Sequence, residues 1–140
     1  MTSISRELLG AYAATDYKVL QPEAPFIVHI GEYSSALALL QAAYGVHCSA
    51  MITGYNPYSM TRADAENAAA NAALFADIAG LNLPWLPAHG ADPSGICPPE
   101  PGAWIAGISF EAAFALSQKY QQNAFVFADE TAVPRLGLCE

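Results

Sequence analysis

The residues of this sequence that carry chemistry are mainly side-chain amides with one prominent carboxylate. Asn56 and Ser59 lie in the segment Asn56-Pro57-Tyr58-Ser59, which follows a hydrophobic run, and Glu100 stands between two prolines directly before another hydrophobic run. Amides donate and accept hydrogen bonds, whereas a carboxylate can anchor a ligand or act as a general base. The pattern predicts a site that binds a small polar molecule; it leaves open whether a reaction is catalysed there and names no catalytic residue.

The other candidates are polar residues at positions where burial is expected. An unsatisfied buried polar group costs about 1–3 kcal/mol, so an inward-facing polar side chain needs a partner or a ligand. On a helix over residues 61–79, the inward face carries polar residues in the first two turns and apolar residues after them. The complete set of predicted ligand-binding residues is Asn56, Ser59, Asp64, Asn67, Asn71, Glu100, Gln122 and Asn123.

Each candidate also has a structural interpretation that the sequence leaves open. Asparagine before proline is typical of a turn. Ser59 suits a helix cap better than a nucleophile, since no Gly-x-Ser-x-Gly segment surrounds it. Asn67 and Asn71 can be satisfied core amides, and Gln122-Asn123 can close a turn into the next strand.

No metal or cofactor is expected from the sequence. The histidines lack the spacing of a metal site, and neither a phosphate-binding loop nor a dinucleotide fingerprint occurs. The three cysteines are an odd number with wide spacings, which favours reduced thiols in a cytoplasm. The N-terminus does not look like a signal peptide, and no apolar run has the length of a membrane-spanning helix.

Length and charge limit the partners of the chain. Its 140 residues predict a single α/β domain over residues 1–140. The net charge is −8, from 13 acidic and 5 basic residues, and the basic residues are scattered along the chain. This acidic protein therefore lacks the basic patch that nucleic acids or anionic membranes need. A second copy of the chain, forming a homodimer, remains a candidate partner.

The elements that must position these residues follow from hydrophobic periodicity and breakers. Helices are predicted at about 4–13, 35–44, 61–79 and 109–120, and strands at 26–30, 48–55, 83–86, 103–108 and 124–128. Ser34 or Ser35, Ser59 or Thr61, and Ser109 are the expected helix caps. Residues 87–101, rich in proline, are predicted to form a long loop that covers the site.

This element order predicts an α/β fold with a mixed five-stranded sheet packed with about four helices. Helices between the first three strands favour parallel neighbours, and the loop before the fourth strand makes strands four and five antiparallel to them. Asn56 at the end of the second strand, Glu100 before the fourth and Gln122-Asn123 before the fifth would then meet at one sheet edge. Ligands commonly bind at such an edge.

Several segments resemble a known family. They are Thr15-Asp16-Tyr17, Ile52 to Ser59, Glu66-Asn67, Asn71 to Leu74, Gly90 to Pro93, Pro99-Glu100-Pro101 and Gln122-Asn123-Ala124. The chain is similar from Tyr12 onward to the bacterial domain-of-unknown-function 3293 family. That family brings no established activity, so the resemblance implies a bacterial cytosolic domain and leaves the function open.

A protein-protein interaction module without catalytic activity is the alternative hypothesis. Its basis is the acidic balance, the proline-rich loop and a set of tyrosines that could form a recognition surface. These tyrosines are Tyr12, Tyr33, Tyr44, Tyr55 and Tyr58.

Overall fold

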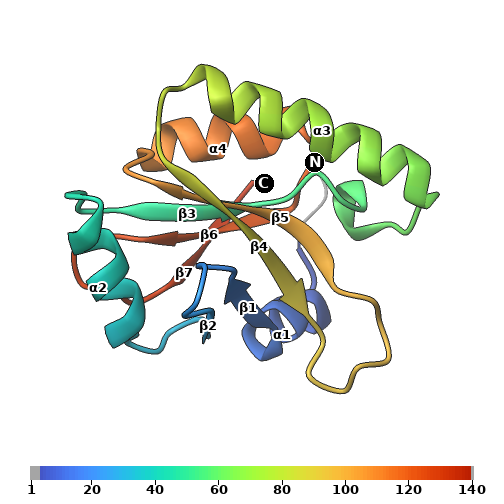
Figure 1. Cartoon of the computed structure of the whole chain (residues 1–140). Helices are drawn as coiled ribbons and strands as arrows, with labels where there is room; N and C mark the ends of the chain where they lie inside the picture. The colour runs from blue at the N-terminus through green and yellow to red at the C-terminus, as the bar shows by residue number, and fades with distance from the viewer. Residues whose placement is uncertain (1–3, 140) are drawn as a thin grey trace.

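The computed structural model describes residues 4–139, which form one curled sheet packed with helices (Figure 1). The helices are α1 (Arg6–Ala14), α2 (Ser35–Ala43), α3 (Asp64–Gly80) and α4 (Phe110–Lys119), with a short 3-10 helix η1 (Pro57–Ser59). The strands are β1 (Asp16–Val19), β2 (Phe26–Val28), β3 (Ser49–Ile52), β4 (Trp85–Ala91), β5 (Glu100–Ala106), β6 (Ala124–Ala128) and β7 (Arg135–Leu138). No helix in this part of the chain is long and apolar enough to cross a membrane.

The sheet has seven strands in the order β2-β1-β4-β5-β3-β6-β7, and every neighbouring pair is antiparallel. The predicted five-stranded mixed sheet with parallel neighbours is therefore wrong. Helix α3 joins β3 to β4, but β5 lies between these two strands and pairs with both. Helix α4 joins β5 to β6 in the same way, with β3 between them. Each helical connection passes an intervening strand, so no parallel pair forms.

Two strands, β1 and β7, lie in segments for which the sequence predicts neither a helix nor a strand. The predicted loop 87–101 is also too long, because β4 continues to Ala91 and β5 begins at Glu100. Proline is tolerated at position 87 of β4 because the ladder to β1 ends at the next residue, where Ala88 pairs with Val19. The connection between β4 and β5 is therefore a hairpin loop of residues 92–99 only.

Serine caps fix the starts of α1, α2 and α4. The hydroxyl oxygens of Ser5, Ser34 and Ser109 each accept a hydrogen bond from the backbone N–H three residues later, which satisfies a helix N–H that otherwise has no partner. Helix α3 differs from the prediction. It begins only at Asp64, and its N-cap Ala63 provides no side-chain hydrogen bond. Neither Ser59 nor Thr61 caps it.

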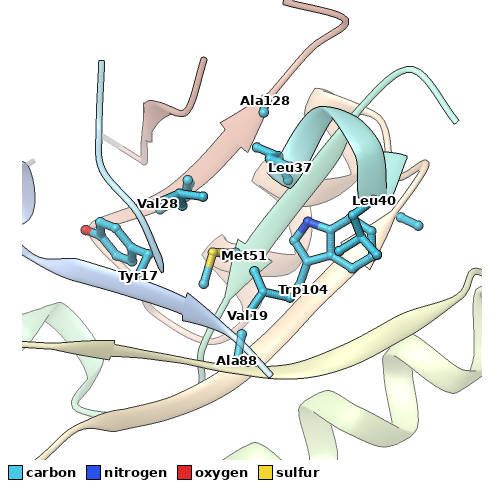
Figure 2. Close-up of a cluster of buried hydrophobic side chains, with 11 residues drawn as sticks. Tyr17, Val19, Val28, Leu37, Leu40, Met51, Ala88, Trp104 and Ala128 are labelled. Carbon is cyan, nitrogen blue, oxygen red and sulfur yellow. The ribbon is translucent and has the colours of Figure 1, made fainter. Parts of the chain in front are cut away.

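The sheet separates two apolar clusters. On one face, α2 packs Leu37 and Leu40 against Trp104 and Met51 of the central strands, and Tyr17 and Val19 of β1 complete the cluster (Figure 2). On the other face, α3 and α4 lie side by side (Figure 1). Leu74 and Ile78 of α3 belong to one apolar cluster with Ala103 and Ile105 of β5. Strand β3 is buried at all four positions because both clusters cover it.

The two edges of the curled sheet are tied together by their adjoining loops. The backbone N–H of Gly31, after β2, donates to the carbonyl oxygen of Pro134, before β7, at 2.7 Å, and Ser34 N–H donates to the Ala132 carbonyl at 3.0 Å. Gly31 has a φ of 83°, a conformation that glycine adopts readily. These bonds hold the two edges of the sheet close to each other.

Candidate functional site

The turn after β3 has an unusual backbone conformation. The backbone is left-handed at three of its residues, with φ values of 47° at Asn56, 53° at Tyr58 and 60° at Ser59. Residues other than glycine rarely adopt this conformation. Such residues cost about 1–3 kcal/mol each and persist only where the surrounding structure holds them. The segment after α4 helps to hold the turn, because Tyr58 N–H donates to the Gln121 carbonyl oxygen at 2.6 Å.

Two asparagines connect this turn to a carboxylate and a cation. Asn56 Nδ2 donates to Glu100 Oε1 at 2.7 Å, and Asn67 Nδ2 donates to Asn56 Oδ1 at 2.9 Å. Asn67 Oδ1 in turn accepts hydrogen bonds from Arg62 Nε at 2.7 Å and from Asn56 N–H at 2.8 Å. The amides therefore form a continuous chain from the Arg62 guanidinium to the Glu100 carboxylate, and bonds in such chains polarise one another.

Glu100, the first residue of β5, lies beside a tyrosine of β1. In the sheet register Glu100 is opposite Gly90, which is opposite Tyr17. A Cβ on Gly90 would lie 3.6 Å from Cδ1 and Cε1 of the Tyr17 ring. The missing side chain at Gly90 therefore leaves room for the Tyr17 ring over this strand. Glu100 itself is half-buried.

A hydroxyl and an amide complete the site. The Tyr12 hydroxyl of α1 and the Ser59 hydroxyl lie 3.1 Å apart, and Asn123 Nδ2 donates to Ser59 Oγ at 3.0 Å. Tyr12 also interacts electrostatically with Glu100. We call this group the Glu100 rim; its members are Tyr12, Asn56, Ser59, Glu100 and Asn123. It lies where α1, the turn after β3, the start of β5 and the start of β6 meet.

Burial determines the protonation properties of the rim. It raises the pKa of Glu100, and the hydrogen bond from Asn56 opposes this effect. Burial also raises the pKa of Tyr12; the hydrogen bond with Ser59 lowers it, and the nearby charge of Glu100 raises it. The pKa of Tyr17 is raised mainly by burial. Both phenols are therefore neutral at neutral pH, and they act as hydrogen-bonding groups and not as bases.

Three of the predicted residues are buried behind the rim and serve the backbone. Asn71 Oδ1 accepts from Gly54 N–H at 2.7 Å, and Asn71 Nδ2 donates to the Pro101 carbonyl at 2.9 Å. Gln122 Nε2 donates to the carbonyl oxygens of Tyr55 at 3.0 Å and Tyr120 at 3.2 Å. Asn67 holds the Asn56 backbone, as described above. The side chains of Asn71 and Gln122 bind only backbone groups, whereas Asn67 also binds the Asn56 side chain from behind the rim.

The inward face of α3 differs from the predicted one. Its buried residues are Asn67, Asn71, Leu74 and Ile78. Asp64 is exposed and lies apart from the rim. The structure thus brings Asn56, Ser59, Glu100 and Asn123 together, places Asn67, Asn71 and Gln122 behind them, and leaves Asp64 outside.

The structure has a core cavity and a surface groove, and both lie away from the rim. A cavity of about 10 Å³ lies in the core beside Trp104, and a groove of about 270 Å³ runs along residues 27–36. None of the eight predicted ligand-binding residues lines either of them. Within residues 4–139, no group of three or more histidine, cysteine, aspartate or glutamate side chains could hold a metal ion.

Sequence reasoning missed three contributors to the site. The sequence assigns Tyr12 only to the alternative recognition surface, gives Tyr17 no predicted element, and includes Arg62 in the helix predicted over residues 61–79. Arg62 in fact precedes α3, and its Nη2 donates to the Gly54 carbonyl at 3.0 Å. Recognising the alternating burial of residues 16–19 as a strand would have placed Tyr17 in the sheet.

The raised pKa of Glu100 leads to a pH-dependent prediction for Glu100→Gln. A carboxyl group with a higher pKa in the folded than in the unfolded state favours folding when protonated, and this contribution is lost as the pH rises through the folded-state value. Glutamine does not ionise and keeps an oxygen for Asn56. The stability of the variant relative to wild type is therefore expected to rise between about pH 4 and about pH 7, measured by urea unfolding at both pH values.

Glu66→Gln is the charge-matched control, because Glu66 is an exposed acid of α3 outside the rim. A stability difference for Glu100→Gln that changes with pH no more than that of Glu66→Gln would contradict the prediction.

Together, the fold and the site define an antiparallel α/β domain with a hydrogen-bonded polar rim at one end of its sheet. The family described as Protein of unknown function (DUF3293) matches residues 52–125. This is more than half of the 140 residues, so the chain belongs to that family, as its motifs predicted. The matched range includes Asn56, Glu100 and Asn123 and ends before β7. Searches among curated proteins and among solved structures found no match.

Proposed function

We propose that this protein binds a small polar ligand at the Glu100 rim in the cytoplasm of a bacterium. The observation that carries the proposal is the combination of burial and sparse hydrogen bonding at the Glu100 side chain. It is half-buried, and the Asn56 amide is its one hydrogen-bond partner within residues 4–139. Removing a carboxylate from water is unfavourable unless other groups replace its hydration. A ligand that contacts Glu100 would supply the missing interactions.

The surrounding groups support binding because they are held in place. The amide chain from Arg62 fixes the Asn56 side chain, and the shared Ser59 hydroxyl fixes Tyr12 relative to Asn123. A preorganised site loses little conformational freedom when a ligand binds. In this proposal Glu100 anchors the ligand, and Tyr12 and Asn123 orient it.

The alternative interaction module stays a prediction, because no single surface favours it. The exposed tyrosines Tyr33, Tyr44 and Tyr58 belong to three different segments, the loop before α2, the end of α2 and η1. Trp85 of β4 stacks on Phe75 of α3, with the ring centres 5.1 Å apart, and both rings pack against the core.

The proposal is tested by a ligand screen with a residue-level readout. Wild-type protein labelled with ¹⁵N is mixed with nucleotides, amino acids, sugars and amines, and the side-chain amide signals of Asn56 and Asn123 are followed. At least one compound is expected to shift both signals and to raise the melting temperature, as binding to the native state alone must do. Glu100→Gln is expected to lose both effects.

Glu66→Gln is again the matched control and is expected to respond as the wild type does. If no compound of any class moves the signals of the rim, or if Glu100→Gln responds as the wild type does, the proposed binding site is wrong.

A further inference from the structure

We propose that the ligand of the Glu100 rim is a cation, an amine or guanidinium compound whose N–H groups bind the second carboxylate oxygen of Glu100. This inference rests on the proposed function and names the class of ligand. It follows from three features of the rim: the hydrogen-bonding atoms that remain free, the absence of a cation from the protein beside Glu100, and the charge of the whole chain.

Two oxygens of the rim are acceptors that receive no hydrogen bond from the described residues. Glu100 Oε1 accepts from Asn56, but Glu100 Oε2 receives no hydrogen bond from residues 4–139. Asn123 Nδ2 is used by Ser59, whereas Asn123 Oδ1 likewise receives none from the described residues. A carboxylate and an amide oxygen can only accept, so a ligand that satisfies both must donate. Ammonium and guanidinium groups carry several donors and no acceptor.

The protein itself does not neutralise Glu100. In the described part of the chain, the contacts between acidic and basic side chains join His29 to Asp16 and Glu32, and Lys119 to Asp77. Arg62 is linked to Glu100 only through two amides, and its guanidinium nitrogens donate to Asn67 and to the Gly54 carbonyl. A half-buried carboxylate without a cation is a site where a positive ligand gains more than it would in water, because the interaction between charges strengthens as water is excluded.

The net charge of −8 acts in the same direction. A negative surface potential raises the local concentration of cations and repels anions. An anionic ligand at the rim would meet both this potential and the Glu100 carboxylate, whereas a neutral ligand would leave the carboxylate charge unbalanced.

The experiment compares cationic probes with neutral and anionic ones on the intact chain. Agmatine and putrescine are titrated by calorimetry and by ¹⁵N NMR, with glucose and malonate as the neutral and anionic probes. At least one cationic probe is expected to bind and to shift the Asn56 and Asn123 side-chain signals. In Glu100→Gln its affinity is expected to fall about tenfold or more, as for loss of a charge-assisted hydrogen bond.

Asp64→Asn is the matched variant, because it removes one negative charge from an exposed position outside the rim. It is expected to bind the cationic probe within about twofold of wild type, since exposed charges contribute little. Circular dichroism and the melting temperature establish that both variants are folded.

The outcomes separate this inference from the proposed function. Equal losses in Glu100→Gln and Asp64→Asn would show non-specific attraction and overturn the inference. Glu100-dependent binding of a neutral or anionic compound, without binding of either cationic probe, would overturn the cationic class and leave the rim as a binding site. Failure of every compound in the screen and of both cationic probes would overturn both.

Discussion

Replacement of Gly102 by alanine is expected to destabilise the protein by about 3 kcal/mol, because overpacking against rigid groups costs roughly this much. A Cβ at this position would overlap the carbonyl oxygen of Ile52 and would lie 3.1 Å from Cα of Thr53. Both atoms belong to the backbone at the end of β3, so they cannot move aside as a flexible side chain would. The close crossing of β5 and β3 at this point also sets the position of Pro101, to which the Thr53 hydroxyl donates.

Gly80→Ala is the matched control for Gly102→Ala. Gly80 is the last residue of α3, and a Cβ there would have no atom within 4 Å. Alanine suits a helix better than glycine, so this variant is expected to be as stable as wild type or more stable by about 0.5 kcal/mol. Urea unfolding of both variants measures the difference. Similar stabilities for the two variants would show that the strands do not meet as closely as described.

Asn71→Ala is expected to cost about 3 kcal/mol of folding free energy, since an unsatisfied buried backbone group costs about 1–3 kcal/mol. The side chain is 4% exposed. It connects the Gly54 N–H with the Pro101 carbonyl and so joins the ends of β3 and β5 beneath the rim. Alanine leaves both backbone groups without this partner and leaves a small cavity beside them.

Gln118→Ala provides the comparison for Asn71→Ala, because it removes an exposed amide from α4 and is expected to change the stability by less than about 0.5 kcal/mol. Chemical denaturation gives the free energies, and the Gly54 amide signal in NMR spectra reports the lost hydrogen bond directly. A loss for Asn71→Ala no larger than that for Gln118→Ala would mean that water satisfies the two backbone groups.

The sequence allowed the main helices and the central strands to be predicted, but not the order of the strands. Periodicity and serine caps depend on neighbouring residues, so α2 and α4 could be recognised locally. The order of the strands depends on whether a third strand inserts between two strands that a helix connects. Nothing local to residues 49–52 or 85–91 indicates that β5 separates β3 from β4, and the rule that a crossover helix joins parallel neighbours fails for this reason.

The candidate site could be predicted in part, because its polar residues interrupt hydrophobic runs. Asn56, Glu100 and Asn123 were recognised in this way. The separation of Asn71 and Gln122 from the rim could not be, because an amide that binds the backbone and one that faces a ligand have the same sequence pattern. Tyr17 joins the site only through the pairing of β1 with β4, and Tyr12 only through the contact of α1 with the turn after β3. Both contacts connect residues far apart in the chain.

The position of β3 has a consequence for how the protein is made. Its two partners in the sheet, β5 and β6, both follow it in the chain, and α3 and β4 are synthesised in between. A ribosome therefore releases the apolar segment Ser49–Ile52 well before either partner exists. Pairings between distant segments form slowly, and unpaired apolar strands are prone to aggregate. The centre of the sheet can assemble only after most of the chain has been translated.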